Sequence, residues 1–213
     1  MAILEGKVGA SQAYGQGGQE KIALGQFAQT LTGDISARFQ EAVRKGNCFI
    51  AVDGTTRLLD APSGTPVGMV VANPAGSGKN FVLWFASASH NGVALTAGGV
   101  VELAANFNPL ATIVSGGTAV TVRNCLIGGA QQSTAKVAVA ATAPSGTAIF
   151  SLGNLTTGAI TTTVWAESLR SPIDGLLMLS QGTSVAFHST VSQTTASTGG
   201  TINCTLIWEE VPA

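Results

Sequence analysis

The chain has 213 residues, of which 45% are hydrophobic, so it is long enough for one large domain with a sizeable core, or for a domain plus an arm. Only 10% of the residues are charged, the net charge is −1 and no basic tract occurs, which argues against direct binding of nucleic acid. No apolar run is long enough to predict a membrane span. A soluble surface normally carries more charge, so we expect much of this surface to contact other protein.

The first region of the chain is predicted to be an arm. Residues 1–60 contain 12 of the 21 charged side chains, and residues 1–20 are rich in Gly and Gln, which is typical of an extended segment. Residues 32–46 predict a short helix, because Ile35, Phe39 and Val43 recur on one helical face. We divide the chain into an N-terminal arm, residues 1–46, and a β body, residues 47–213. The three apolar residues are the candidate assembly contacts; the alternative is that this face packs on the chain's own β body.

The β body is predicted from many short apolar runs separated by Gly, Pro, Asn and Ser. Such strands at short intervals, without interleaved helices, favour an all-β sandwich or barrel over a parallel sheet. The expected strands are Cys48–Val52, Val67–Val71, Phe81–Ser89, Val100–Ala104, Thr118–Cys125, Lys136–Ala140, Ala148–Leu152, Thr161–Ala166, Leu176–Leu179, Ser184–Ser189 and Thr201–Glu209.

Two local features of the last third carry further predictions. The segment Ser180–Thr183, centred on Gly182, predicts a hairpin between the two strands that flank it. The closing strand alternates apolar and mostly polar residues, as expected of a half-buried strand. Pro212 is predicted to end that strand, with Glu209 and Glu210 protecting its edge from further pairing.

The segment Asn73-Pro-Ala-Gly-Ser-Gly-Lys-Asn80 resembles a phosphate-binding loop but departs from it at both ends. Asn73 replaces the first Gly, and Asn80 replaces the hydroxyl residue that holds Mg²⁺. The residues that follow predict a strand, whereas a phosphate-binding loop must open a helix. We therefore predict a turn between two strands and no nucleotide site.

The residue types that carry chemistry are sparse. The three cysteines, Cys48, Cys125 and Cys204, are far apart and show no metal or redox spacing, so buried structural thiols are predicted. His90 and His188 have no neighbouring ligand at metal spacing. We assign no catalytic residue, no cofactor and no metal site, and expect that the protein is not an enzyme.

One enzymatic alternative remains open on this sequence. Glu167 lies in a predicted strand and would have to face Asp174 or Glu209 across the fold to form a glycosidase-like carboxylate pair. Nothing in the spacing selects this pair.

Several segments together resemble a family of small β-rich virion structural proteins of tailed bacteriophages. They are Ile3–Lys7, Glu41–Asn47, Asn73–Asn80 and Trp208–Pro212. The resemblance implies a jelly-roll body with an extended arm, in a capsid decoration or cement protein located in the virion after assembly in the host cytoplasm. The expected partners are further copies of this chain, as a homotrimer, and the major capsid protein or other virion proteins. The alternative is a tail or head-fibre component that displays loops, such as Thr190–Thr201, to a host receptor.

Overall fold

The computed structural model describes residues 35–53, 58–61, 68–92, 95–97, 99–106, 117–140, 146–155, 165–195 and 201–213. The chain divides into two units, Met1–Lys45 and Gly46–Ala213. Within the described ranges, one helix, α2 (Ile35–Arg44), precedes a series of strands. No helix in these ranges is long and apolar enough to cross a membrane.

Helix α2 confirms the predicted helix, and its C-terminal end shows why it stops there. The Lys45 N–H donates to the Glu41 carbonyl oxygen at 3.0 Å, and the Lys45 ammonium lies 3.3 Å from the Glu41 carboxylate. Gly46 follows with a positive φ of 72°, a conformation that favours glycine and ends helices. Residues 32–34 of the predicted range lie outside the described residues.

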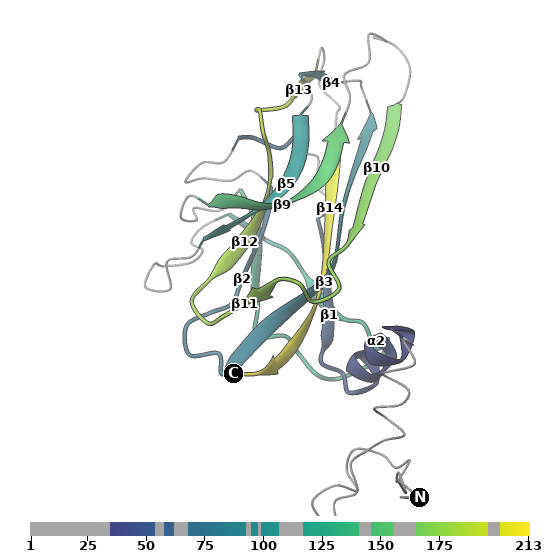
Figure 1. Cartoon of the computed structure of the whole chain (residues 1–213), viewed down its shortest axis with the longest axis vertical. Coiled ribbons are helices and arrows are strands. Elements are labelled where there is room, and N and C mark those ends of the chain that lie inside the picture. The colour runs from purple at the N-terminus through teal and green to yellow at the C-terminus, as the bar shows by residue number, and fades with distance from the viewer. Residues whose placement is uncertain are drawn as a thin grey trace, which may run out of the picture. The chain divides into compact units, whose positions relative to one another are not determined.

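The strands form two six-stranded antiparallel sheets, seen as two layers in Figure 1. The first sheet has the order β10-β3-β14-β1-β7, with β11 also paired to β3. Its strands are β1 (Cys48–Asp53), β3 (Lys79–Gly92), β7 (Val122–Asn124), β10 (Trp165–Pro172), β11 (Met178–Leu179) and β14 (Thr201–Pro212).

The second sheet has the order β6-β8-β2-β12-β5-β9. Its strands are β2 (Met69–Ala72), β5 (Gly99–Asn106), β6 (Thr118–Ala119), β8 (Lys136–Val139), β9 (Thr147–Leu155) and β12 (Ser184–Ser189). A separate small ribbon joins β4 (Leu95–Ala97) to β13 (Thr194–Thr195).

Four of the strand pairings are nested along the chain. β1 pairs with β14, β2 with β12, β3 with β10, and β5 with β9, all antiparallel. Along the sequence, β5 and β9 lie between β3 and β10, which lie between β2 and β12, which in turn lie between β1 and β14. The paired strands are far apart in the sequence, so the fold depends on hydrogen bonds between distant segments.

One hydrophobic core receives side chains from both sheets, so the all-β, sandwich-like architecture is confirmed. β14 contributes alternate residues, and its burial alternates along the strand as predicted. Trp208 on β14 is fully buried and lies against two rings, with centroid separations of 6.3 Å to Phe49 and 6.2 Å to Phe81. From the second sheet, Leu103 and Phe187 belong to the same core cluster.

Two predictions about the last third of the chain are wrong. The segment Ser180–Thr183 does form a turn, with the Thr183 N–H donating to the Ser180 carbonyl oxygen at 3.2 Å. However, β11 before it pairs with β3 in the first sheet, and β12 after it lies in the second sheet, so no hairpin forms. β14 is an interior strand between β3 and β1, so Glu209 and Glu210 protect no edge.

The predicted strand Thr118–Cys125 is also divided. β6 belongs to the second sheet and β7 to the first, so the chain crosses between sheets in the middle of this segment. A run of β-forming residues indicates extended backbone but does not indicate which sheet each part joins.

Candidate assembly surface

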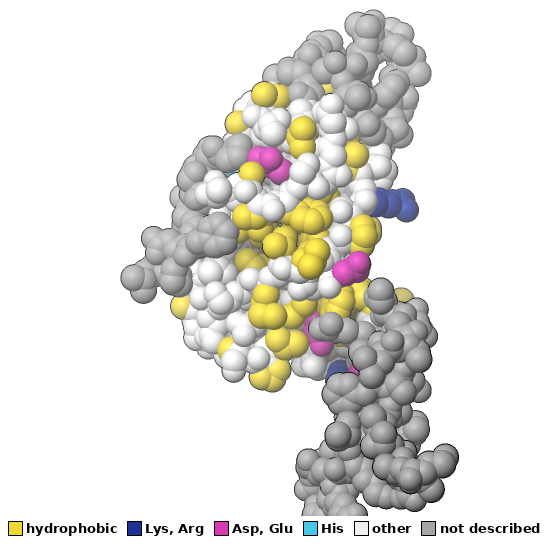
Figure 2. Space-filling model, viewed as in Figure 1, with side chains coloured by type: hydrophobic (Ala, Val, Ile, Leu, Met, Phe, Trp, Pro, Cys, Tyr) yellow, Lys and Arg dark blue, Asp and Glu magenta, His cyan; other side chains and the backbone are white. Residues whose placement is uncertain are grey.

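An apolar seam lies where β11 and β9 come near each other at the side of the two sheets. A small cavity of about 160 Å³ opens there, lined mainly by apolar side chains, among them Leu83, Ile149 and Leu177. Beside it, Leu176 is 81% exposed and Met178 is 58% exposed. Figure 2 shows hydrophobic side chains gathered in the middle of this face, over the region between β9 and β11, with few charged groups around them. We call Ile149, Leu176, Leu177 and Met178 the apolar seam.

The exposure of the seam follows from the tight path of the chain after β10. Asp174 and Gly175 both have positive φ, and the Gly175 N–H donates to the Leu83 carbonyl oxygen at 2.8 Å. The Leu177 carbonyl oxygen then accepts from the Leu83 N–H at 2.9 Å. Leu176 ends this turn, in which its N–H donates to the Ile173 carbonyl oxygen at 3.0 Å, and its side chain faces solvent, whereas Leu177 packs against the core.

A second group of exposed apolar side chains lies on the loop after β7. Ile127 is 98% exposed and Leu126 is 39% exposed, and both line a shallow groove of about 690 Å³. The far end of this loop is fixed by Glu210 of β14, whose carboxylate accepts hydrogen bonds from Ser133 and Thr134. An anchored loop with a hydrophobic tip is a second surface suited to contact with protein.

The sequence pattern does not indicate that Leu176, Met178, Leu126 or Ile127 is exposed. Each lies in or next to a run with apolar residues, and such residues are ordinarily buried. Met178 is exposed because of the way β11 pairs with β3, whereas Leu126 and Ile127 are exposed because they lie on a loop.

The predicted assembly contacts lie on α2. Ile35, Phe39 and Val43 follow one another at intervals of four residues along α2. Phe39 and Val43 are each partly buried. Their role in assembly stays a prediction.

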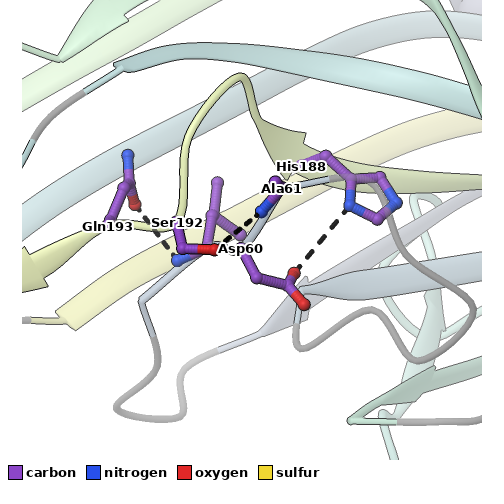
Figure 3. A network of polar contacts seen from close by, with 6 residues as sticks. Asp60, Ala61, His188, Ser192 and Gln193 are labelled. Carbon is purple, nitrogen blue, oxygen red and sulfur yellow. Dashed lines mark hydrogen bonds and ion pairs between the residues drawn. The ribbon is translucent and has the colours of Figure 1, made fainter.

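A polar cluster around the buried His188 is the arrangement most similar to a catalytic site among the described residues, and Figure 3 shows it. His188 Nδ1 lies 3.8 Å from Asp60 Oδ1, which is longer than a hydrogen bond. Burial lowers the pKa of His188, and the nearby Asp60 carboxylate only partly opposes this. A catalytic His–Asp pair needs a short, directed hydrogen bond, so this geometry does not provide one.

The hydrogen bonds around this cluster instead join two segments of the chain. Leu59 donates its N–H to Gln193 Oε1 at 3.1 Å, and the Gln193 N–H donates to the Leu59 carbonyl oxygen at 2.8 Å. The Ala61 N–H donates to Ser192 Oγ at 3.3 Å. These hydrogen bonds therefore connect residues 58–61 to the segment after β12.

The residues considered for a glycosidase-like pair have backbone positions that are far apart. Glu167 pairs with His90 of β3, and His90 pairs with Ile202 of β14. Glu209 lies seven residues after Ile202 on β14, which at 3.3 Å per residue is roughly 23 Å along the strand. β10 continues for five residues beyond Glu167, roughly 16 Å, before the turn that holds Asp174. Glycosidase pairs need much shorter separations, about 5–9.5 Å.

One further motif from the sequence is structural. The segment that resembles a phosphate-binding loop is a turn between β2 and β3, as predicted. In the described part of the chain, His, Cys, Asp and Glu form no group of three that could hold a metal ion.

Comparison with protein-family models, characterised proteins and solved structures finds no match to this chain.

Proposed function

We propose that this chain is a structural protein of a tailed-bacteriophage virion, a capsid decoration protein that self-associates through the apolar seam of its β body. The observation that carries the proposal is the exposure of Leu176 and Met178 beside an apolar cavity. Contiguous apolar surface on a domain with few charges marks a site of protein contact. The work of such a protein is mechanical and requires no catalytic residue.

The nested strand pairing supports a jelly-roll body. Numbered along the chain, β1, β2, β3, β5, β9, β10, β12 and β14 are strands one to eight. One sheet then contains the order 6-3-8-1 and the other 2-7-4-5, which is the order of a two-stranded ribbon wrapped into a jelly roll. The jelly roll is an architecture of viral capsid domains and of lectins. One fold can have many functions, so the proposal depends on the exposed apolar seam, and the topology is additional support.

The remaining parts of the proposal follow the family resemblance. The N-terminal arm binds the shell, with the α2 face of Ile35, Phe39 and Val43 as its anchor, and the β bodies associate as a homotrimer. The major capsid protein or another virion protein is the partner. The small number of charged side chains agrees with a surface that is covered in the particle.

The experiment compares the oligomeric state and capsid binding of three forms of the full chain by mass photometry. The double variant Leu176→Asp/Met178→Asp places two charges in the seam and is expected to be monomeric where the wild type is trimeric. Thr118→Asp, on exposed β6 at the opposite edge of the second sheet from β9, is the control and is expected to remain trimeric. A seam variant that still forms trimers would exclude the seam as the contact.

Mixing the wild-type trimer with capsids tests the virion location. Saturation at high copy number supports a decoration protein. A trimer that does not bind capsids favours the alternative, a tail or head-fibre component that displays loops to a receptor. A wild-type chain that is monomeric at all concentrations contradicts the assembly proposal.

A further inference from the structure

Two of the three cysteines face each other across the pairing of β1 with β7. The register joins Phe49 to Asn124, so the next residues outward, Cys48 and Cys125, are opposite each other. The Cys125 N–H donates to the Cys48 carbonyl oxygen at 2.9 Å, which continues the ladder to this position. Directly opposed residues of antiparallel strands have Cα atoms about 4.5–5.5 Å apart. That separation lies within the range of about 4.4–6.8 Å that a disulfide spans.

The two thiols are also in contact and have different surroundings. They share a hydrogen bond, which raises the pKa of Cys48, together with burial, and lowers the pKa of Cys125. The difference between the two thiols that matters for reaction with a small molecule is their exposure to solvent. Cys48 is fully buried, whereas Cys125 is partly exposed. The thiolate is the reactive form of cysteine, and the more accessible sulfur, that of Cys125, is expected to react first.

We propose that Cys48 and Cys125 form a thiol–disulfide exchange site whose substrate is a small disulfide such as oxidised glutathione. Cys125 loses its proton to water, and its thiolate attacks one sulfur of the small disulfide. This forms a mixed disulfide and expels the first thiolate, which takes up a proton from water. Cys48 then attacks the Cys125 sulfur, forms the internal disulfide and expels the second thiolate, which takes up the Cys48 proton. In total, the two cysteine thiols are oxidised, and one small disulfide is reduced to two thiols.

The internal disulfide would join a short edge strand of the first sheet to its neighbour. β7 has three residues and pairs only with β1 in the described sheet order, so few hydrogen bonds hold it. Cys48 and Cys125 are 77 positions apart in the numbering, and a bond that closes a long loop restricts the unfolded chain strongly. We expect the oxidised chain to have a Tm roughly 5–15 °C above that of the reduced chain.

The first test is peptide mapping of the full-length chain. The reduced protein is incubated with oxidised glutathione, free thiols are alkylated, and the chain is digested with trypsin without reduction. Cleavage after Lys45, Arg57, Arg123 and Lys136 isolates Cys48 and Cys125 on separate peptides, residues 46–57 and 124–136. We expect these two peptides to be joined and two glutathione thiols to be released per chain. Recovery of both peptides unlinked, or of either linked to the Cys204 peptide, overturns the proposal.

The second test separates the roles of the two sulfurs. Cys48→Ser is expected to stop at a mixed disulfide of glutathione on Cys125, because the second step has lost its nucleophile. Cys125→Ser is expected to leave Cys48 unmodified over the same time. Cys204→Ala is the control, since Cys204 is buried and its pKa is raised by burial, and it is expected to keep the internal disulfide.

A measurement on the unaltered chain covers the case in which a variant fails to fold. Brief alkylation of the native reduced protein is expected to label Cys125 at least tenfold faster than Cys48. Equal labelling of the two thiols, or faster labelling of Cys48, contradicts the assigned order of attack.

Discussion

The side chain of Glu210 on β14 accepts hydrogen bonds from both the backbone and the side chain of Thr134, which precedes β8. The Thr134 N–H and hydroxyl each lie 3.0 Å from a Glu210 carboxylate oxygen, and the Ser133 hydroxyl donates to the same carboxylate. Glu210 is 3% exposed. A buried carboxylate is tolerated where donors surround it, so this residue is an anchor for the loop that bears Leu126 and Ile127.

Replacing Glu210 by Gln should destabilise the fold by roughly 2 kcal/mol, because hydrogen bonds to a charged acceptor are lost and an amide N–H₂ meets donors. Urea denaturation measures the change in the free energy of unfolding. Glu102→Gln makes the same chemical change at a partly exposed position and should alter stability by less than about 0.5 kcal/mol. Equal effects of the two substitutions would show that Glu210 does not anchor the loop.

Asn73 should be essential to the turn between β2 and β3. Its side-chain amide donates to the Lys79 carbonyl oxygen at 2.8 Å and to the Leu179 carbonyl oxygen at 3.0 Å. Asn73→Asp has the same shape but turns both donors into acceptors that face carbonyl oxygens. The expected loss is about 3 kcal/mol in the free energy of unfolding, measured by denaturant titration.

The matched control for Asn73→Asp is Asn80→Asp, at the other end of the same turn. Asn80 is partly exposed, so its carboxylate can remain hydrated and the loss should be below about 1 kcal/mol. If Asn73→Asp is no more damaging than Asn80→Asp, the amide hydrogen bonds contribute little.

His188 should make stability depend on pH. Burial lowers its folded-state pKa below the usual value of 6.5, so the unfolded chain binds more protons as the pH falls below about 6.5. The free energy of unfolding should therefore fall on acidification, by up to about 1.4 kcal/mol per pH unit from this residue, and be fully retained above pH 6.5. The measurement is denaturant unfolding of wild type and His188→Asn from pH 5 to 8.

The difference between the two proteins isolates His188 from the other titrating groups. It should change with pH below about 6.5 and stay constant from pH 7 to 8. Parallel curves over the whole range would mean that the protonation of His188 is the same in the folded and unfolded chains.

The α2 face should contribute to particle attachment if the proposed function is right. Phe39→Ala removes the largest apolar side chain from that face and should weaken capsid binding roughly tenfold or more, measured by titration of capsids with the trimer. Gln40→Ala, at the adjacent exposed position, is the control and should bind as the wild type does. Unchanged binding by Phe39→Ala would remove the anchor role from this helix.

The local pattern of the sequence determined the kinds of elements and many of their positions. The strand predicted at Ser184–Ser189 is β12, the alternation in the closing strand is that of β14, and the turn at Asn73–Asn80 connects two strands. These features follow from the backbone preferences and side-chain alternation of neighbouring residues, which a single segment contains.

Only the tertiary structure decided which segments become partners. The contact of Cys48 with Cys125, the burial of Glu210 beside Thr134 and the exposure of Met178 all depend on antiparallel pairing between segments far apart in the chain. Sequence spacing carries no information about such pairs, because the register of one strand on another is fixed by the whole core and not by either strand alone. The local residues therefore specify strands, and the packing of two sheets specifies the sites.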